Sequence, residues 1–357
     1  MRLLALCVLT FFLLPSVYAQ GLGQGTRDAP VQDWPRADPD TMGLNADALQ
    51  AHLDRCRESG SYGCLVAYQG YVVQEWYRHD HASPFVKTRS AVKSWTGLLA
   101  GMLIADGAID SVDVPVAKYI PEWTAGARAG VTLRHLLTMT SGLRDHTGGE
   151  NTVPPVDQPH DNDTLHPGVV AKKDLTGYVL DLPLDWPPGE RFSYSNEGVQ
   201  LLSPLLERAA GIPLAQYARE RLFAPLGMDQ TRLGVDAYYN TATFGGAETT
   251  VPDFARIGQL MLNEGRWNDQ QIVPASWVER STTPTMRNYG FLWWIDPARD
   301  NFAATGSLDN VCIVYPELDL VAARMQRDPR PDAEVKYQSV QTFNVLHRIV
   351  DQPENSE

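Results

Sequence analysis

The chain reads RSAVKSWTGLLAGMLIA from position 89 to position 105, and the expected fold is organised around this stretch. From Gly97 onward the residues are almost continuously apolar, and Asp106 followed by Gly107 marks the end of the run. Apolar character sustained over this length predicts a buried helix. Ser90 lies at the beginning of that helix and Lys93 three residues later, so their side chains share one face, one turn apart.

A serine and a lysine in this arrangement suit nucleophilic chemistry. A serine hydroxyl becomes a good nucleophile only when a neighbouring group takes its proton, and a partly desolvated lysine can do so or can tune the group that does. The helix N-terminus also offers free N–H groups to an oxyanion. Ser-x-x-Lys alone also occurs at ordinary helix starts, but a lysine on a buried helix requires a partner or a function.

Composition and charge narrow the class of protein. The 357 residues carry a formal net charge of −13, without a basic stripe or a block of like charges. This balance argues against nucleic acid or an anionic membrane surface as a partner. The length suits one large domain with a sizeable core, or two intimately packed ones. We expect a small-molecule partner, and the sequence gives no indication of an oligomeric state.

The N-terminus resembles a secretory signal over residues 1–19. Arg2 provides the positive end, an apolar run follows, and Val17-Tyr18-Ala19 forms an A-x-A-like cleavage site before Gln20. The run is too short to span a bilayer, although an uncleaved anchor is the alternative, and no other segment is long and apolar enough. Residues 20–42, rich in Gly, Pro, Asp and Gln, then read as a linker or arm. We therefore expect a periplasmic or extracellular protein.

Three cysteines remain after such cleavage. Cys56 and Cys64 flank a glycine-containing turn between a predicted helix and a predicted strand, where an oxidising compartment would permit a disulfide. Cys312 lies in a predicted core strand and is expected to be a buried small hydrophobe. The cysteines do not have the spacing of a metal site.

Periodicity along the chain predicts the order of elements. We expect helices at about 45–57, 90–105, 132–137, 197–210, 213–223, 252–262, 274–281 and 334–350. We expect strands at about 64–68, 71–77, 289–295, 302–305, 310–315 and 319–324. Strands thus lie at both ends and helices between them. This order predicts an α+β fold in which an antiparallel sheet, built from both chain ends and flanked by helices, carries an inserted, mainly helical region.

A polar stretch, residues 145–163, contains no apolar period, and a loop of this length is usually functional or disordered. Histidines and aspartates occur in and just after it: His146, His160, Asp161, Asp163 and His166. They could ligate a metal, but their spacing fits neither a helix nor a hairpin, so a solvated loop that borders the site is the default. We expect neither a metal nor another cofactor.

Two further polar motifs are candidates for the site. Tyr194 and Asn196 alternate by two, so in extended backbone they would point the same way, and a tyrosine held near a lysine can act as a base. In the second motif, Thr305, Gly306 and Ser307 follow a predicted strand; the glycine would let a ligand approach, and the Ser307 N–H could serve an oxyanion. In isolation these motifs read as a polar turn and a strand end.

Together, four stretches in this order resemble the β-lactamase-related serine hydrolases, which include class C β-lactamases, D,D-peptidases and esterases of the same fold. The stretches are SAVKSWTG at 90–97, TLRHLLTMTSGL at 132–143, PGERFSYSN at 188–196 and YGFLWW at 289–294. The resemblance implies a catalytic domain over about 43–352, with a sheet lobe at 43–89 and 285–352 and a helical lobe at 90–284.

The resemblance also implies roles for individual residues. Ser90 would be the acylated nucleophile, Lys93 and Tyr194 the base pair, and Asn196 a hydrogen-bonding site residue. The Ser90 and Ser307 amides would form the oxyanion hole. His135, in the second stretch, is more simply a structural histidine.

One departure bears on the substrate. Ala304 stands where the family often carries a Lys or His that meets a substrate carboxylate, and Asp309-Asn310 stands where relatives often have Gly-Gln. We therefore expect a secreted serine hydrolase that cleaves an ester or small amide through an acyl-enzyme. A β-lactamase or D-Ala-D-Ala peptidase is the alternative within the class, and a non-catalytic binding protein that retains the fold is the alternative outside it.

Overall fold

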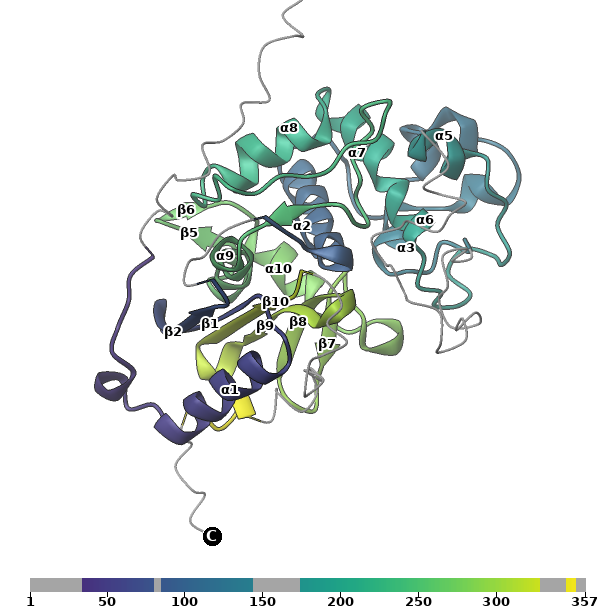
Figure 1. Ribbon diagram of the computed structural model, residues 1–357. Coiled ribbons are helices and arrows are strands. Elements are labelled where there is room, and N and C mark those ends of the chain that lie inside the picture. Colours follow the sequence, from purple (N-terminus) through teal and green to yellow (C-terminus); the bar gives the residue numbers. More distant parts are fainter. Residues whose placement is uncertain (1–33, 80–84, 144–173, 328–344, 351–357) are drawn as a thin grey trace, which may run out of the picture. The chain divides into compact units, whose positions relative to one another are not determined.

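The computed structural model describes residues 34–79, 85–143, 174–327 and 345–350. Its largest element is a six-stranded sheet with the order β2-β1-β10-β9-β8-β7, in which every neighbouring pair is antiparallel (Figure 1). The strands are β1 (Gly63–Tyr68), β2 (Tyr71–Tyr77), β7 (Trp294–Asp296), β8 (Asn301–Gly306), β9 (Asn310–Tyr315) and β10 (Leu320–Met325). Two short ribbons accompany it: β3 (Val86–Lys87) with β4 (Glu248–Thr249), and β5 (Arg266–Trp267) with β6 (Gln270–Gln271).

The two ends of the chain meet in the middle of this sheet. The hairpin β1–β2 turns at Gln69 and Gly70, which both have positive φ, as tight hairpin turns require. β1 then pairs with β10 along its whole length, from Gly63 opposite Met325 to Tyr68 opposite Leu320. The predicted α+β fold, with an antiparallel sheet built from both chain ends and flanked by helices, is therefore confirmed.

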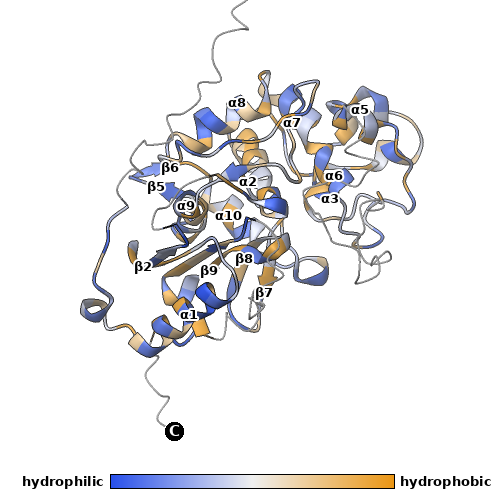
Figure 2. Cartoon of the chain, viewed as in Figure 1, coloured by the Kyte–Doolittle hydropathy of each residue, from blue (hydrophilic) through white to orange (hydrophobic). Residues whose placement is uncertain are grey.

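Both faces of the sheet are apolar, and successive residues alternate between them. On β10, Leu320 and Ala322 belong to the core beneath α1 (Ala46–Glu58), whereas Val321 and Ala323 belong to the core on the opposite face. That second core is shared with α2 (Val92–Ala105) and α9 (Val251–Leu262). Hydrophobic colour accordingly gathers on the central strands and on α2 in Figure 2.

The other α-helices of the described ranges all contribute residues to this second core (Figure 1). They are α3 (Leu133–Leu137), α5 (Leu175–Leu180), α6 (Asn196–Gln200), α7 (Leu202–Ala210), α8 (Leu214–Ala218) and α10 (Ala275–Ser281). α9 approaches the sheet closely at Gly258, where a Cβ would lie 2.6 Å from the Cys312 sulfur. The closeness of that approach explains why a residue without a side chain stands there. Cys312 is buried, as predicted.

α2 is buried over almost its entire length, as the sequence predicts. The Trp277 indole, from α10, donates to the Gly97 carbonyl (3.0 Å), and the Ser94 hydroxyl donates to the Leu292 carbonyl (2.6 Å). These contacts fix α2 against segments that lie far away in the chain. Side chains at its N-terminal end therefore have a rigid support.

A disulfide joins Cys56, at the end of α1, to Cys64 on β1. The sulfurs lie beside His52, whose Nδ1 is 2.9 Å from the Gln74 amide oxygen. Burial lowers the pKa of His52. Because both cysteine sulfurs are committed to the disulfide, this cluster does not act as a set of metal ligands. None of the helices in the described ranges has the length and hydropathy needed to cross a membrane.

Two predicted elements are wrong in part. The strand expected at 289–295 begins only at Trp294, because Leu292 adopts a φ of 63° and its amide donates to the Leu137 carbonyl (3.0 Å). Asn196 does not continue an extended segment; it is the first residue of α6, capped by the Ser195 hydroxyl. Most of the predicted helix at 334–350, and the whole polar stretch at 145–163 with His166, lie outside the described residues. The lobe boundaries stay a prediction.

Candidate functional site

Ser90 and Lys93 lie within hydrogen-bonding reach of each other. Ser90 belongs to a short 3-10 turn, Arg89–Ala91, which runs directly into α2. The Lys93 amine donates to the Ser90 hydroxyl (2.9 Å) and to the Phe244 carbonyl (2.8 Å), and the residue is only 1% exposed. An amine so withdrawn from water is poised to exchange a proton with the hydroxyl beside it.

Tyr194 joins this pair from a distant part of the chain. Its ring centroid lies 5.0 Å from the Lys93 amine, within the range of a cation–π contact. The ring stacks on Trp294, with centroids 5.9 Å apart and planes inclined by 20°, and packs edge-on against Tyr289. Burial and the nearby Tyr194 raise the pKa of Tyr289 well above its ordinary value, so Tyr289 stays neutral. The aromatic neighbours therefore hold Tyr194 beside Lys93.

The backbone on either side of Tyr194 is fixed by a single residue. The Ser193 amide donates to the Met139 carbonyl (2.8 Å), and the Ser195 amide donates to the Met139 sulfur (3.5 Å). Met139 itself has a φ of 58°. A residue other than glycine keeps a left-handed backbone only where its surroundings enforce it. The conformation of Met139 therefore points to a segment shaped to position Tyr194.

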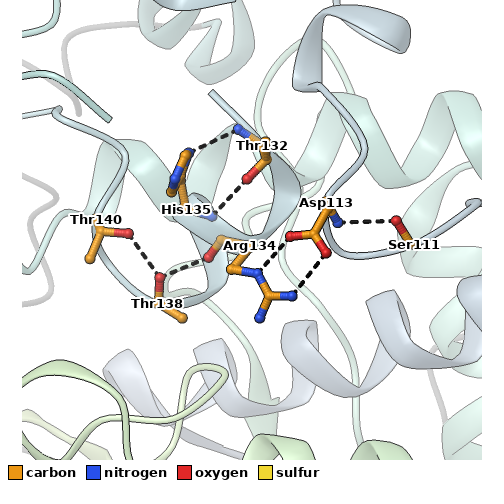
Figure 3. A network of polar contacts seen from close by, with 7 residues as sticks. All are labelled: Ser111, Asp113, Thr132, Arg134, His135, Thr138 and Thr140. Carbon is orange, nitrogen blue, oxygen red and sulfur yellow. Dashed lines mark hydrogen bonds and ion pairs between the residues drawn. The ribbon is translucent and has the colours of Figure 1, made fainter. Parts of the chain in front are cut away.

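The segment that ends at Met139 is stabilised by its own polar network (Figure 3). Thr132 and His135 form a reciprocal cap on α3: the His135 amide donates to the Thr132 hydroxyl (3.4 Å) and the Thr132 amide to His135 Nδ1 (3.2 Å). Burial, with a contribution from Arg134, lowers the pKa of His135 and favours the neutral ring that this cap needs. Arg134 also forms a two-pronged pair with Asp113 (2.7 and 2.9 Å).

The third motif, Ala304 to Ser307, reaches Ser90 from the sheet. A Cβ on Gly306 would lie 2.4 Å from the Thr88 carbonyl and 3.0 Å from the Ser90 nitrogen, so only glycine lets β8 approach so closely. Ser307 follows at the first position of a 3-10 turn, and Ser90 is the second residue of another. Amides at such positions lack partners within their turn, and neither turn has a side-chain cap.

A small hollow lies beside Asn196 and Phe244, and its lining does not include Ser90, Lys93 or Tyr194. Asn196 contributes to its wall, as does Phe244, whose carbonyl holds Lys93. Thr305 and Ser307 are partly exposed at the end of β8, whereas Ala304 is buried. The pocket is lined by Leu175, Tyr178, Val179, Asn196, Glu197, Gln200 and Phe244.

Several groups that build the site were not foreseen from the sequence. The Phe244 carbonyl is held in place because the Thr96 hydroxyl donates to the Thr243 carbonyl (2.9 Å), and the Thr243 hydroxyl to the Val199 carbonyl (2.8 Å). A backbone carbonyl has no side-chain signature, so no motif could have identified it. Trp294 belongs to the stretch YGFLWW at 289–294, but the sequence did not predict its contact with Tyr194. The backbone that leads to Trp294 turns at Leu292, which has a positive φ.

Comparisons with known proteins agree with this architecture. The family model described as Beta-lactamase matches residues 49–346. A 6-aminohexanoate-dimer hydrolase from Paenarthrobacter ureafaciens is 27% identical over 328 residues, which cover 83% of this chain and 82% of that protein. Esterase EstB from Burkholderia gladioli is 29% identical over 219 residues, 54% of this chain and 53% of that protein.

A similar structure has been solved for a Bacillus anthracis protein assigned as a 6-aminohexanoate-dimer hydrolase. It superposes with a TM-score of 0.71 at 21% identity, covering 89% of this chain and 88% of the other. At that identity the likeness concerns the fold alone.

Proposed function

The chain belongs to the β-lactamase family of serine hydrolases, and from this premise we propose that it cleaves a small ester or linear amide through an acyl-enzyme on Ser90. The observation that carries the proposal is the buried Lys93 amine, 2.9 Å from the Ser90 hydroxyl. The related hydrolase of 6-aminohexanoate dimer and the related esterase support an amide or ester as substrate class.

The proposed reaction proceeds in two halves. The substrate carbonyl oxygen lies between the Ser90 and Ser307 amides, and the Ser90 oxygen attacks the carbonyl carbon while Lys93 and Tyr194 take its proton. The same pair returns the proton to the leaving alcohol or amine. Water, deprotonated by the pair, then attacks the acyl carbon, the bond between that carbon and the Ser90 oxygen breaks, and the pair returns the proton to the Ser90 oxygen as the acid leaves. Asn196 and Thr305 would make hydrogen bonds to the bound substrate.

The direct test is intact-mass detection of an adduct on Ser90. We expect a fluorophosphonate to add stoichiometrically, and short-chain nitrophenyl esters and linear amides to be turned over. Nitrocefin turnover would favour the β-lactamase alternative, which the buried Ala304 disfavours because it offers no cation to a substrate carboxylate. If no ester, amide, β-lactam or fluorophosphonate modifies the protein, a non-catalytic binding protein replaces the proposal.

We further propose that the chain is exported and cleaved after Ala19. The signal-like N-terminus supports this, and so does the Cys56–Cys64 disulfide, since such bonds persist in oxidising compartments. We expect N-terminal sequencing of the protein produced in a bacterial host to begin at Gln20. We expect cell fractionation to recover the protein outside the cytoplasm. A cytoplasmic protein that retains Met1 or Arg2 would contradict export.

A further inference from the structure

The turn that carries Ser307 has a backbone shape that its own residues do not favour. Leu308 and Asp309 adopt φ values of 64° and 54°, and neither residue is glycine. A left-handed backbone is strained for leucine and uncommon for aspartate, so two such residues in succession require support from outside the turn. The orientation of the Ser307 amide depends on that support.

Arg324, on β10, supplies it. This arginine is 1% exposed, and its guanidinium donates to the carbonyls of both Leu308 and Asp309. It also donates to the Ser61 hydroxyl (2.9 Å) and to the Gln326 amide oxygen (2.7 Å). The rigid, planar fork of an arginine can hold several carbonyls in a fixed relation, which a lysine cannot do.

Asn310 links the same region to the nucleophile. Asn310 is 0% exposed, and its side-chain nitrogen donates to the Lys87 carbonyl (2.9 Å). Its side-chain oxygen accepts a hydrogen bond from the backbone N–H of Gln326 (2.6 Å). Lys87 precedes Ser90 by three residues. Asn310 therefore joins the segment that enters the Ser90 turn to the end of β10, immediately beyond Arg324.

The Ser90 turn has a second tie to this strand end. Arg89, whose φ is 57°, donates to the Arg327 carbonyl (3.1 Å). The backbone on both sides of the oxyanion hole is thus held in left-handed conformations by groups at residues 324–327. Motion of either turn alone would change the separation of the Ser90 and Ser307 amides.

We propose that Arg324 and Asn310 are positioning residues that together set the distance and direction between the Ser90 and Ser307 amides. The inference rests on the proposed function, since it assumes that these two amides bind the oxyanion. Both side chains are buried, so neither is placed to contact a substrate. Their effect is exerted through the carbonyls of Lys87, Leu308 and Asp309.

The test compares an oxoester with the matching thionoester, in which sulfur replaces the carbonyl oxygen. Sulfur is larger and a weaker acceptor, so a well-formed oxyanion hole favours the oxoester. We expect Arg324→Met and Asn310→Ala to lower kcat/KM for the oxoester by about 10- to 100-fold, because misplaced donors lose transition-state binding. The thionoester should lose less, so the oxoester-to-thionoester ratio of kcat/KM should fall in both variants. In Arg324→Lys we expect that ratio to lie between the values of Arg324→Met and of the native protein.

Matched controls separate positioning from lost stability. Arg256→Met removes another buried arginine, which pairs with Asp253, and Asn301→Ala removes a buried asparagine at the opposite end of β8. Both should leave the oxoester-to-thionoester ratio unchanged, since a ratio does not depend on the folded fraction. Equal losses for the two substrates in Arg324→Met and Asn310→Ala, or no loss, would overturn the proposal. Esterase activity that survives Ser90→Ala would instead overturn the proposed function.

Discussion

Replacing Ser90 with alanine is expected to lower kcat/KM for a nitrophenyl ester by at least about 10⁴-fold, leaving only what binding and the oxyanion donors contribute. The change removes one oxygen and the hydrogen bond that it accepts from Lys93. Since Ser90 is partly exposed and its turn is held by backbone contacts, the fold should persist. Steady-state kinetics and the loss of the fluorophosphonate adduct are the measurements.

Ser94→Ala is the matched control for this change. Ser94 lies one turn further along the same helix, and its hydroxyl donates to the Leu292 carbonyl rather than to a catalytic group. We expect that variant to lose stability but to keep its activity per folded molecule. Comparable activity in Ser90→Ala and the native protein would show that another residue is the nucleophile.

Lys93→Met is expected to lower kcat/KM by about 10³-fold, within the range for loss of a general base. Methionine occupies a similar volume without a charge, so the buried helix should remain packed. The Phe244 carbonyl loses the hydrogen bond that it accepts from Lys93, yet the cost of keeping the amine away from water is also removed, and we expect little net change in thermal stability. The measurements are kcat/KM, thermal unfolding and the extent of fluorophosphonate labelling.

Lys118→Met provides the comparison, since that lysine is exposed and paired with Asp110. It should leave kcat/KM unchanged. Tyr194→Phe, made in parallel, keeps a ring on Trp294 but removes the phenol, so it distinguishes the phenol from the amine as the proton acceptor. A Lys93→Met enzyme within tenfold of the native rate would exclude a role for the amine in proton transfer.

Much of the architecture could be predicted because the deciding signals are local. The spacing of Ser90 and Lys93 on one helix determines their proximity, and the alternation of apolar residues identifies the central strands. The site as a whole required the resemblance to a family, because Tyr194 lies 101 positions from Lys93 in the printed numbering and no local pattern joins them.

What could not be predicted depends on backbone atoms and on long-range packing. The Phe244 carbonyl reaches Lys93 through contacts between segments remote in sequence, and Leu292 leaves the extended conformation because of its bond to Leu137. Arg324 lies in a strand of otherwise apolar residues, where a charged side chain is unexpected until the turn at Leu308 and Asp309 is seen. We predicted an extended backbone at Asn196, whereas in the structure Ser195 caps α6 and Asn196 is the first residue of that helix.

The pairing of β1 with β10 has a consequence for biosynthesis. Ser90 leaves the ribosome early, whereas Ser307 and β10 with Arg324 emerge much later. A nascent polypeptide that already contains Ser90, the proposed nucleophile, still lacks β10, the strand that joins the two halves of the sheet. Contacts between such distant segments form slowly, after most of the chain is available. We therefore expect a ribosome-bound chain that lacks β10 to be inactive, and hydrolysis to begin only when that strand has docked.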